Sequence, residues 1–394
     1  MIHRDLEPAL SKAASSFPIV TLTGPRQSGK STLCRALFKH LGHATLEDTS
    51  VRAFALSDPH RFLAGFPNGA VIDEFQHAPD LASNLQIIVD EDQRPARWIL
   101  TCSENLSITA RVSQSLAGRS AILTLLPASR SEVVRFDTHP TTVDTALRTG
   151  GYLRILDKGL DPTTWLVSYV TTYVERDARS ILNIADLAGF QKFVQMCAGR
   201  TAQVLNLSAL AADCGITQPT AKAWLSVLEA SYLVVLLRPW FRNHGSRLVK
   251  APKLHFIDSG LVCYLLGIHT DQQLASHPLR ASIFESWAVS EVLKQRLSRG
   301  ESPNFSGLFY YRDQKQREAD LLIERHEGAL GHALIEIKSG STISADAFNS
   351  LDRVTAALPA DLKLSRYLIH GGSELQNRTA ATVIPWTGIQ NVRW

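Results

Sequence analysis

Two glycines, a lysine and a serine stand close together near the start of the chain, in the order Gly24-Pro25-Arg26-Gln27-Ser28-Gly29-Lys30-Ser31. This spacing is the pattern G-x-x-x-x-G-K-[ST], in which glycines let successive backbone N–H groups point at phosphate oxygens. Lys30 would neutralise the β and γ phosphates, and Ser31 would offer its hydroxyl to Mg²⁺. Arg26 and Gln27 lie at the loop tip, where they could face solvent or a neighbouring subunit. The pattern predicts binding of ATP and Mg²⁺ by this run together with Thr32.

Two acids follow a second apolar run, in the order Ala70-Val71-Ile72-Asp73-Glu74. Asp73 would hold Mg²⁺ through water, and Glu74 would polarise the water that attacks the γ-phosphate. Two solvated acids at an exposed strand end are the alternative, and the phosphate loop upstream favours the catalytic interpretation. A third apolar run leads to Thr101 and Ser103, either of which could sense the γ-phosphate. We count Ser103 among the catalytic candidates.

The elements that must position these residues alternate along the chain. The β-branched run Ile19–Thr23 predicts a strand before the loop, Thr32–His40 predicts a helix after it, and Asp80–Asp92 predicts another helix. Strand, glycine-bounded loop and helix in this order place the phosphate site at the carboxyl ends of parallel strands. The expected fold class is therefore α/β, with a doubly wound parallel sheet.

Four segments, Gly24–Ser31, Val71–Gln76, Ile99–Ser103 and Leu116–Arg119, resemble the prokaryotic AAA-type ATPases that carry a C-terminal nuclease-like domain. The resemblance runs through nearly the whole chain. It implies a P-loop ATPase that forms a homo-oligomer, because nucleotide sites of this type lie between subunits and use a neighbour's arginine. Arg119 could be a transition-state arginine or a surface cation. Arg176, in the run Glu175-Arg176-Asp177, could reach a neighbour's nucleotide or belong to a charged helix face.

A helix-turn-helix is predicted in the middle of the chain. Leu207–Cys214 and Gln218–Leu228 read as helices on either side of Gly215. The second helix offers Gln218, Thr220 and Lys222 near its start, which suits base or phosphate contact in a major groove. Tyr232–Leu237 could follow as the wing of a winged helix. Because winged helices also serve as lids or docking modules, DNA is a candidate partner and protein docking is the alternative.

Acids inside apolar strands mark the C-terminal part. Period-two alternation sends Glu336 and Lys338 to one face of their strand, and Asp320 on the adjoining strand can join them. The spacing resembles the PD-(D/E)XK nuclease fold. By that resemblance Asp320 and Glu336 would be metal ligands, Lys338 their electrostatic partner and Glu285 the helix acid that completes the set. A salt-bridged cluster on a buried sheet, without cleavage, is the alternative.

Length and composition set further limits. A chain of 394 residues exceeds what one hydrophobic core usually organises. We expect an ATPase domain at residues 1–135, a helical lid with a winged helix at 136–250 and a PD-(D/E)XK-like domain at 251–394. The five cysteines form no C-x-x-C pair, which argues against a zinc site or a disulfide framework. No apolar run approaches the ~18 residues of a membrane helix. The expected location is the cytoplasm, without a membrane partner.

Two functional hypotheses follow. In the first, ATP hydrolysis drives an AAA-type protein that acts on nucleic acid through the winged helix and the nuclease-like domain. In the second, ATP controls a protein-interaction switch whose nuclease-like domain is catalytically silent, which the modest net charge of +4 would suit.

Overall fold

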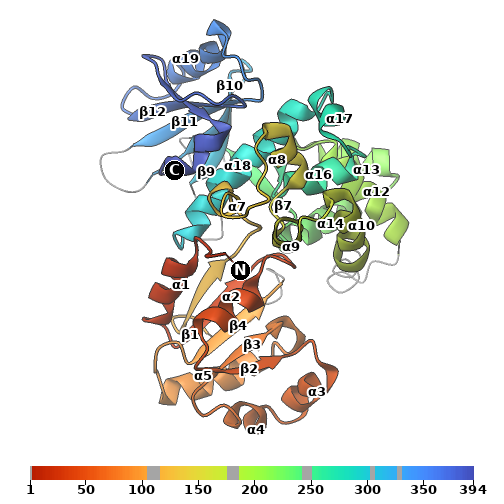
Figure 1. Ribbon diagram of the computed structural model, residues 1–394, viewed down its shortest axis with the longest axis vertical. Coiled ribbons are helices and arrows are strands. Elements are labelled where there is room, and N and C mark those ends of the chain that lie inside the picture. Colours follow the sequence, from red (N-terminus) through yellow and green to blue (C-terminus); the bar gives the residue numbers. More distant parts are fainter. Residues whose placement is uncertain (1, 104–115, 175–185, 242–250, 302–306, 326–330) are drawn as a thin grey trace. The chain divides into compact units, whose positions relative to one another are not determined.

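The computed structural model describes residues 2–103, 116–174, 186–241, 251–301, 307–325 and 331–394 (Figure 1). The chain forms two compact units, each with its own sheet. The first comprises Met1–Ala128, Ala230–Tyr232 and Arg296–Asn304, and the second comprises Ser129–Glu229, Leu233–Gln295 and Phe305–Trp394. The division into three domains at residues 135 and 250 stays a prediction.

A parallel sheet forms the centre of the first unit, and its strand order is β2-β3-β4-β1-β5. The strands are β1 (Ile19–Thr23), β2 (Gly42–Thr45), β3 (Ala70–Asp73), β4 (Trp98–Cys102) and β5 (Ser120–Thr124). Every pairing between neighbours is parallel. β1 and β4 are buried along their whole length, as their continuous apolar runs predict. The sheet confirms the predicted α/β fold of P-loop proteins.

Helices cover both faces of this sheet. They are α1 (Glu7–Ala14), α2 (Lys30–Leu37), α3 (Thr49–Ser57), α4 (Pro59–Ala64) and α5 (Leu81–Glu91). Successive strand residues point to opposite faces, so Val20 packs in a core with Leu10 of α1 and Leu33 of α2. Its neighbour Ile19 packs in a second core with residues of α3, α4 and α5. The sheet is therefore doubly wound.

A mixed sheet runs through the second unit, in the order β13-β14-β12-β11-β10-β9-β7-β8-β6 among the described residues. The strands are β6 (Gln203–Val204), β7 (Val234–Pro239), β8 (Lys253–Phe256), β9 (Leu308–Arg312), β10 (Glu318–Ile323), β11 (His332–Lys338), β12 (Leu364–His370), β13 (Gln376–Asn377) and β14 (Thr382–Pro385). β10 pairs antiparallel with β9 and β11, whereas β11, β12 and β14 are mutually parallel. Asp320 and Glu336 thus lie on adjacent strands, as predicted.

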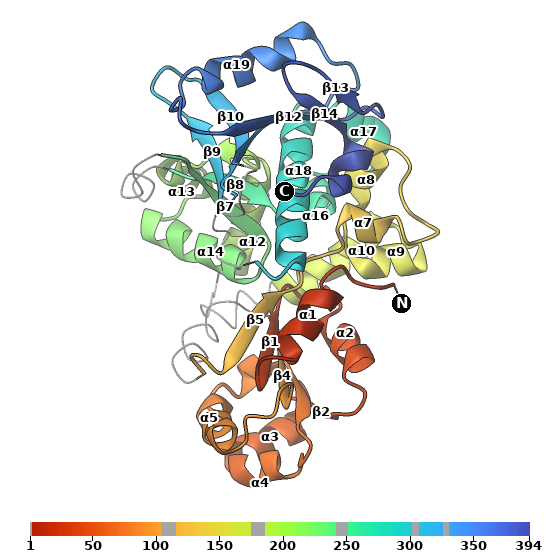
Figure 2. The ribbon, with the colours of Figure 1, turned by 90° about the vertical axis from the view of Figure 1, so that its left-hand side faces the viewer.

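Helices of the second unit precede and follow these strands (Figure 2). They are α7 (Arg130–Val133), α8 (Val143–Thr149), α9 (Leu153–Lys158), α10 (Pro162–Tyr169), α12 (Leu187–Ala198), α13 (Leu207–Cys214), α14 (Gln218–Ala230), α16 (Ser259–Leu265), α17 (Asp271–Ala275), α18 (Arg280–Ser298) and α19 (Asn349–Thr355), and α14 and α18 each end in the first unit. A π-helix, Val170–Val174, continues α10. None of the helices in the described part of the chain has the length and apolar character that a membrane crossing requires.

The predicted helix-turn-helix corresponds to α13 and α14. The Asn206 side chain caps α13 by accepting a hydrogen bond of 3.0 Å from Ala209 N. Gly215, with φ of 72°, ends the helix in the left-handed conformation that favours glycine. Gln218 and Lys222 are exposed, whereas Thr220 is half-buried and its hydroxyl lies 2.8 Å from that of Thr217. The helices form where the sequence predicts them, and their assignment to a winged helix stays a prediction.

Candidate functional site

The phosphate loop joins the end of β1 to the start of α2. Gly24 and Gly29 have positive φ angles of 146° and 90°. A Cβ on Gly24 would lie 2.0 Å from the carbonyl oxygen of Leu125, so the loop can run beside that strand end only with glycine there. Lys30 is 5% exposed, and its ammonium donates to the carbonyl oxygens of Gly24 (2.8 Å) and Pro25 (2.9 Å). Burial, opposed by Glu74 and Asp73, lowers the pKa of Lys30.

Other loop residues divide between the interior and the surface. Gln27 and Thr32 are exposed, as expected for the loop tip and the outer face of α2. Arg26 differs from its predicted exposure, because it is buried with Nη1 3.9 Å from Glu74 Oε2. The carboxylate of Glu74 attracts the guanidinium inward. Ser28 Oγ is buried and has no hydrogen-bond partner in the structure, so it leaves a donor for a phosphate oxygen.

Asp73 connects three elements at the carboxyl edge of the sheet. Ser31, in the first turn of α2, donates a hydrogen bond of 2.8 Å from its hydroxyl to Asp73 Oδ1. The hydroxyl of Thr101 on β4 donates to the same oxygen. A hydroxyl and a carboxylate are oxygen ligands of the kind that Mg²⁺ takes. The donor set therefore fits the magnesium ion that the sequence predicts.

Glu74 follows β3 in the left-handed conformation, with φ of 55°. Its Oε2 accepts hydrogen bonds from the hydroxyl of Ser103 (2.9 Å) and from the side-chain amide of Gln76. Burial acts to raise the pKa of Glu74, but Lys30, Arg26 and these hydrogen bonds outweigh it and hold the pKa below its ordinary value. The structure thus places one sensor candidate, Thr101, on Asp73 and the other, Ser103, on Glu74.

Two residues that the sequence interpretation missed support the loop from behind. Arg4 is 6% exposed and donates from Nη1 to Ser28 O (2.5 Å) and from Nη2 to Leu126 O (2.8 Å). The Tyr232 hydroxyl donates to Thr23 Oγ1 at 2.8 Å, directly before the loop. Tyr232 opens the predicted wing and Arg4 stands in no motif, but no local pattern indicates that either contacts the loop, because each acts on partners far away in the chain.

Two arginines are candidates for contact with a nucleotide, Arg119 and Arg176. Arg119 forms an ion pair with Asp90, with 2.9 Å between Nη2 and Oδ2, at the surface of the first unit. The pair accounts for Arg119 as a surface cation, and its role as a transition-state arginine stays a prediction. Arg176 and its neighbours Glu175 and Asp177 lie outside the described residues.

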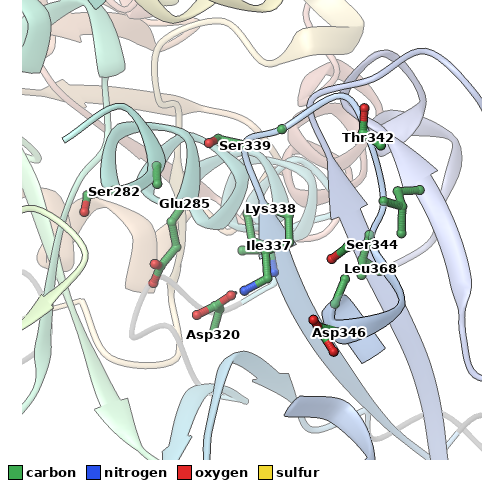
Figure 3. Close-up of a pocket in the computed structure, with 14 residues that line it drawn as sticks. Ser282, Glu285, Asp320, Ile337, Lys338, Ser339, Thr342, Ser344, Asp346 and Leu368 are labelled. Carbon is green, nitrogen blue, oxygen red and sulfur yellow. The ribbon is translucent and has the colours of Figure 1, made fainter. Parts of the chain in front are cut away.

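The acids of the second unit converge as predicted, with an additional cation. Figure 3 shows Glu285 and Asp320 pointing toward each other from α18 and β10. Lys253, at the start of β8, lies 3.0 Å from Glu285 Oε1 and 3.8 Å from Asp320 Oδ1. Burial acts to lower the pKa of Lys253, but Glu285, Asp320 and Glu318 together raise it. Burial and the nearby Asp320 raise the pKa of Glu285, although Lys253 opposes them.

The other two predicted residues pair with each other. Lys338 Nζ lies 2.5 Å from Glu336 Oε1, and the Ser350 hydroxyl donates to Glu336 Oε2 at 2.8 Å. Burial and the nearby Asp320 raise the pKa of Glu336. Glu285, Asp320 and Lys338 line a cavity of about 580 Å³, and the hydroxyl residues Ser339, Thr342 and Ser344 also line it. Among the described residues, no group of three or more His, Cys, Asp or Glu side chains is arranged to hold a metal ion.

Three family descriptions match successive parts of the chain. An AAA domain matches residues 16–134, and two domains of unknown function, DUF8612 and DUF4143, match residues 141–272 and 280–389. The AAA match covers the parallel sheet, the phosphate loop and the acids at the end of β3. Fold, site and match together define a P-loop ATPase of AAA type.

Two relatives by sequence are mycobacterial. The chain is 31% identical over 370 residues to the uncharacterized protein Rv2008c of Mycobacterium tuberculosis, a match that covers 93% of this chain and 79% of the relative. The uncharacterized protein Mb2031c of Mycobacterium bovis matches to the same extent. The chain belongs to the family of these two proteins.

Solved structures give weaker similarities. The Walker-type ATPase PABY2304 of Pyrococcus abyssi has a TM-score of 0.44 and 15% identity, covering 67% of this chain and 96% of that one. The RuvB Holliday junction branch migration motor of Thermotoga maritima has a TM-score of 0.31 and 17% identity, covering 60% of this chain and 90% of that one.

Proposed function

We propose that the first unit binds ATP with Mg²⁺ on the loop Gly24–Ser31 and hydrolyses it, with Glu74 as the base that polarises the attacking water. The observation that carries the proposal is the position of the Ser31 hydroxyl, 2.8 Å from Asp73 Oδ1. Two segments far apart in sequence thereby present oxygen ligands at one point beside the phosphate loop. A buried serine hydroxyl without a partner, Ser28 Oγ, adds a donor to the same loop.

Lys30 and the loop amides would bind the phosphates. The Lys30 ammonium is held 2.8 Å from its own loop carbonyl at Gly24, so it is already close to where the phosphates would lie. Its charge would counter the negative charge that grows on the γ-phosphate in the transition state. Ser31 and Asp73 would hold Mg²⁺, which when bound supplies a further positive charge to the phosphate oxygens.

Glu74 has the surroundings that a general base needs. A pKa below the ordinary value keeps its carboxylate ionised at neutral pH, ready to accept a hydrogen bond from water. Ser103 and Gln76 fix the position of that carboxylate through their hydrogen bonds. We assign Ser103 the role of linking Glu74 to the nucleotide, because its hydroxyl contacts the base directly.

Phosphate release and nucleotide binding test this function in the intact chain. Lys30→Ala should lose nucleotide binding, whereas Glu74→Gln should keep it and lose turnover by about 10²–10⁴-fold. Lys39→Ala and Glu91→Gln change an exposed lysine and an exposed acid in the same unit, and both should behave as wild type. Unchanged turnover in Lys30→Ala and Glu74→Gln together would rule out the proposal.

Nucleic acid is the partner that we propose for α13 and α14. Exposed Gln218 and Lys222 near the start of α14 support this, since a helix start can enter a major groove. Binding of labelled duplex DNA should weaken steeply with added salt, and Lys222→Ala should reduce the salt dependence by about one released counterion. No binding at low salt would instead favour protein docking. A homo-oligomer and a cytoplasmic location remain part of this proposal.

The second candidate is an ATP-controlled interaction switch whose nuclease-like part does not cleave. The ion pairs of Lys253 with Glu285 and Asp320 favour it, because a protein cation already faces the predicted nuclease acids. In the nuclease hypothesis, Asp320→Ala or Lys338→Ala should abolish metal-dependent DNA cleavage and leave ATP turnover intact. In the switch hypothesis, wild type itself should show no cleavage with Mg²⁺ or Mn²⁺.

A further inference from the structure

Lys253 occupies a charged position inside the second unit. Its side chain is 3% exposed, and its ammonium nitrogen lies 3.0 Å from Glu285 Oε1, 2.6 Å from Glu318 Oε1 and 3.8 Å from Asp320 Oδ1. The ring centroid of Tyr310 is 5.6 Å from the same nitrogen. Carboxylates from α18 and β10 therefore converge on the ammonium that the chain itself supplies from β8, and the second oxygen of Glu318 lies 3.6 Å from Arg312 Nε.

The remaining oxygens of the predicted metal ligands have partners of their own. Asp320 Oδ2 accepts a hydrogen bond of 2.8 Å from the backbone N–H of Ile337. Both oxygens of Glu336 are engaged, by Lys338 and by the Ser350 hydroxyl. A hard divalent cation needs several oxygens directed at it. Here those oxygens are directed at ammonium, amide and hydroxyl donors, so the arrangement does not fit a bound divalent ion.

The acids are accessible to ions from solvent, so restricted access does not explain why they do not fit a divalent ion. One cavity of about 580 Å³ contains Glu285 and Asp320 in its lining (Figure 3), and another of about 240 Å³ contains Glu318, Asp320 and Glu336. Ions in solution can thus reach the acids from either cavity. What distinguishes the cluster is the tethered ammonium, which is present at a fixed position whatever the concentration of metal.

We propose that Lys253 is the resident cation of the carboxylate cluster formed by Glu285, Glu318 and Asp320, and that removing its ammonium opens a site for a divalent cation. Half-buried acids left without their cation repel one another, so a free cation gains affinity once the tethered one is gone. The proposal is independent of ATP binding, since none of these residues belongs to the first unit.

Binding of Mn²⁺ in the absence of nucleotide tests the proposal. It is measured by the decrease of the EPR signal of free Mn²⁺. Lys253→Met should bind one Mn²⁺ at least about tenfold more tightly than wild type. Adding Asp320→Asn should remove that gain, whereas adding Asp73→Asn should leave it, which separates this site from the phosphate loop. Lys294→Met is the matched control. Lys294 is also buried, and its ammonium lies 2.9 Å from the carboxylate of Glu291. Its loss should not create a Mn²⁺ site, because the pair lacks the three-acid cluster that would supply several oxygen ligands.

Thermal unfolding gives a second measurement. The midpoint of Lys253→Met should fall without metal and rise again with Mn²⁺, because an ion that binds only the folded state stabilises it. Folded Lys253→Met with no gain in Mn²⁺ binding would overturn the proposal. If Lys253→Met does not fold, a comparison of Mn²⁺ binding by wild type and by Asp320→Asn tests the proposal instead. Equal, weak Mn²⁺ binding by both supports a resident ammonium, and tight binding by wild type that Asp320→Asn abolishes refutes it.

Discussion

The Ser31 hydroxyl donates to Asp73 Oδ1 across 2.8 Å, which joins the first turn of α2 to the last residue of β3. β3 lies two strands away from β1, from which the phosphate loop emerges. The contact therefore depends on the order of the parallel sheet, and it brings the two oxygen ligands of the candidate magnesium site together. Thr101 donates to the same carboxylate oxygen and fixes it from β4.

Removal of magnesium should show whether the Ser31 hydroxyl contributes to ATP binding through the ion. We expect Ser31→Ala to weaken ATP binding in Mg²⁺ by about tenfold or more, a loss of ~1.4 kcal/mol. In EDTA, wild type and variant should bind ATP equally, because the hydroxyl contributes through the ion. Titration of a fluorescent ATP analogue under both conditions measures the difference.

Asp73→Asn provides the matching change on the strand. If both residues act through one ion, the double variant should lose little more affinity than either single variant. Additive losses would indicate that Ser31 and Asp73 act independently. Ser50→Ala, which changes an exposed serine at the start of α3, serves as the control.

The lowered pKa of Glu74 predicts a pH dependence of stability. A carboxylate whose folded pKa is depressed stabilises the protein fully above its unfolded pKa, here the ordinary 4.5. That contribution is lost as the pH falls through the folded pKa. The difference in thermal midpoint between wild type and Glu74→Gln should therefore be constant from pH 7 to about 5 and shrink below 4.5. A difference that shrinks between pH 7 and 6 would contradict the lowered pKa.

The sequence predicts the parts of the site that depend on local spacing. The loop Gly24–Ser31 and the acids after β3 lie where expected, since a strand, a turn and a helix start fix their geometry within a few residues. A place at the loop tip predicts an exposed Arg26, yet this residue is buried, because its partner Glu74 comes from another strand. Such contacts across the sheet leave no local pattern in the sequence.

The long sequence separation from their partners explains why the sequence does not predict the roles of Arg4 and Lys253. Arg4 reaches partners 24 and 122 residues away, and Lys253 reaches Glu285 across 32 residues. Neither stands in a motif, and a lone basic residue near an apolar run predicts only a surface charge. The acids of the second unit were predictable because period-two alternation acts along one strand. The role of Lys253 was not, because β8 is brought to these acids only by the folded unit.

Arg4 should be needed for the phosphate loop as well as for stability. Arg4→Met leaves the carbonyl oxygens of Ser28 and Leu126 without its guanidinium, at a cost of about 1–3 kcal/mol in free energy of unfolding. ATP affinity should fall with it, since Ser28 belongs to the loop. Thermal unfolding and analogue binding measure the two effects. Arg61→Met, at an exposed arginine of α4, should change neither.

The hydrogen bond of Tyr232 to the end of β1, which carries the phosphate loop, can be tested by substitution. Its buried hydroxyl donates to Thr23 Oγ1, which in turn donates to Leu123 O at 3.1 Å. Tyr232→Phe should lower the free energy of unfolding by about 1 kcal/mol, because a hydroxyl pair is lost while the ring stays packed. Burial raises the pKa of Tyr232 to about 12, so the loss should be the same at pH 7 and pH 9. Thermal unfolding at both values measures it, with Tyr264→Phe at a half-buried position of α16 as the control. A loss that disappears by pH 9 would mean that the phenol ionises there and does not donate to Thr23.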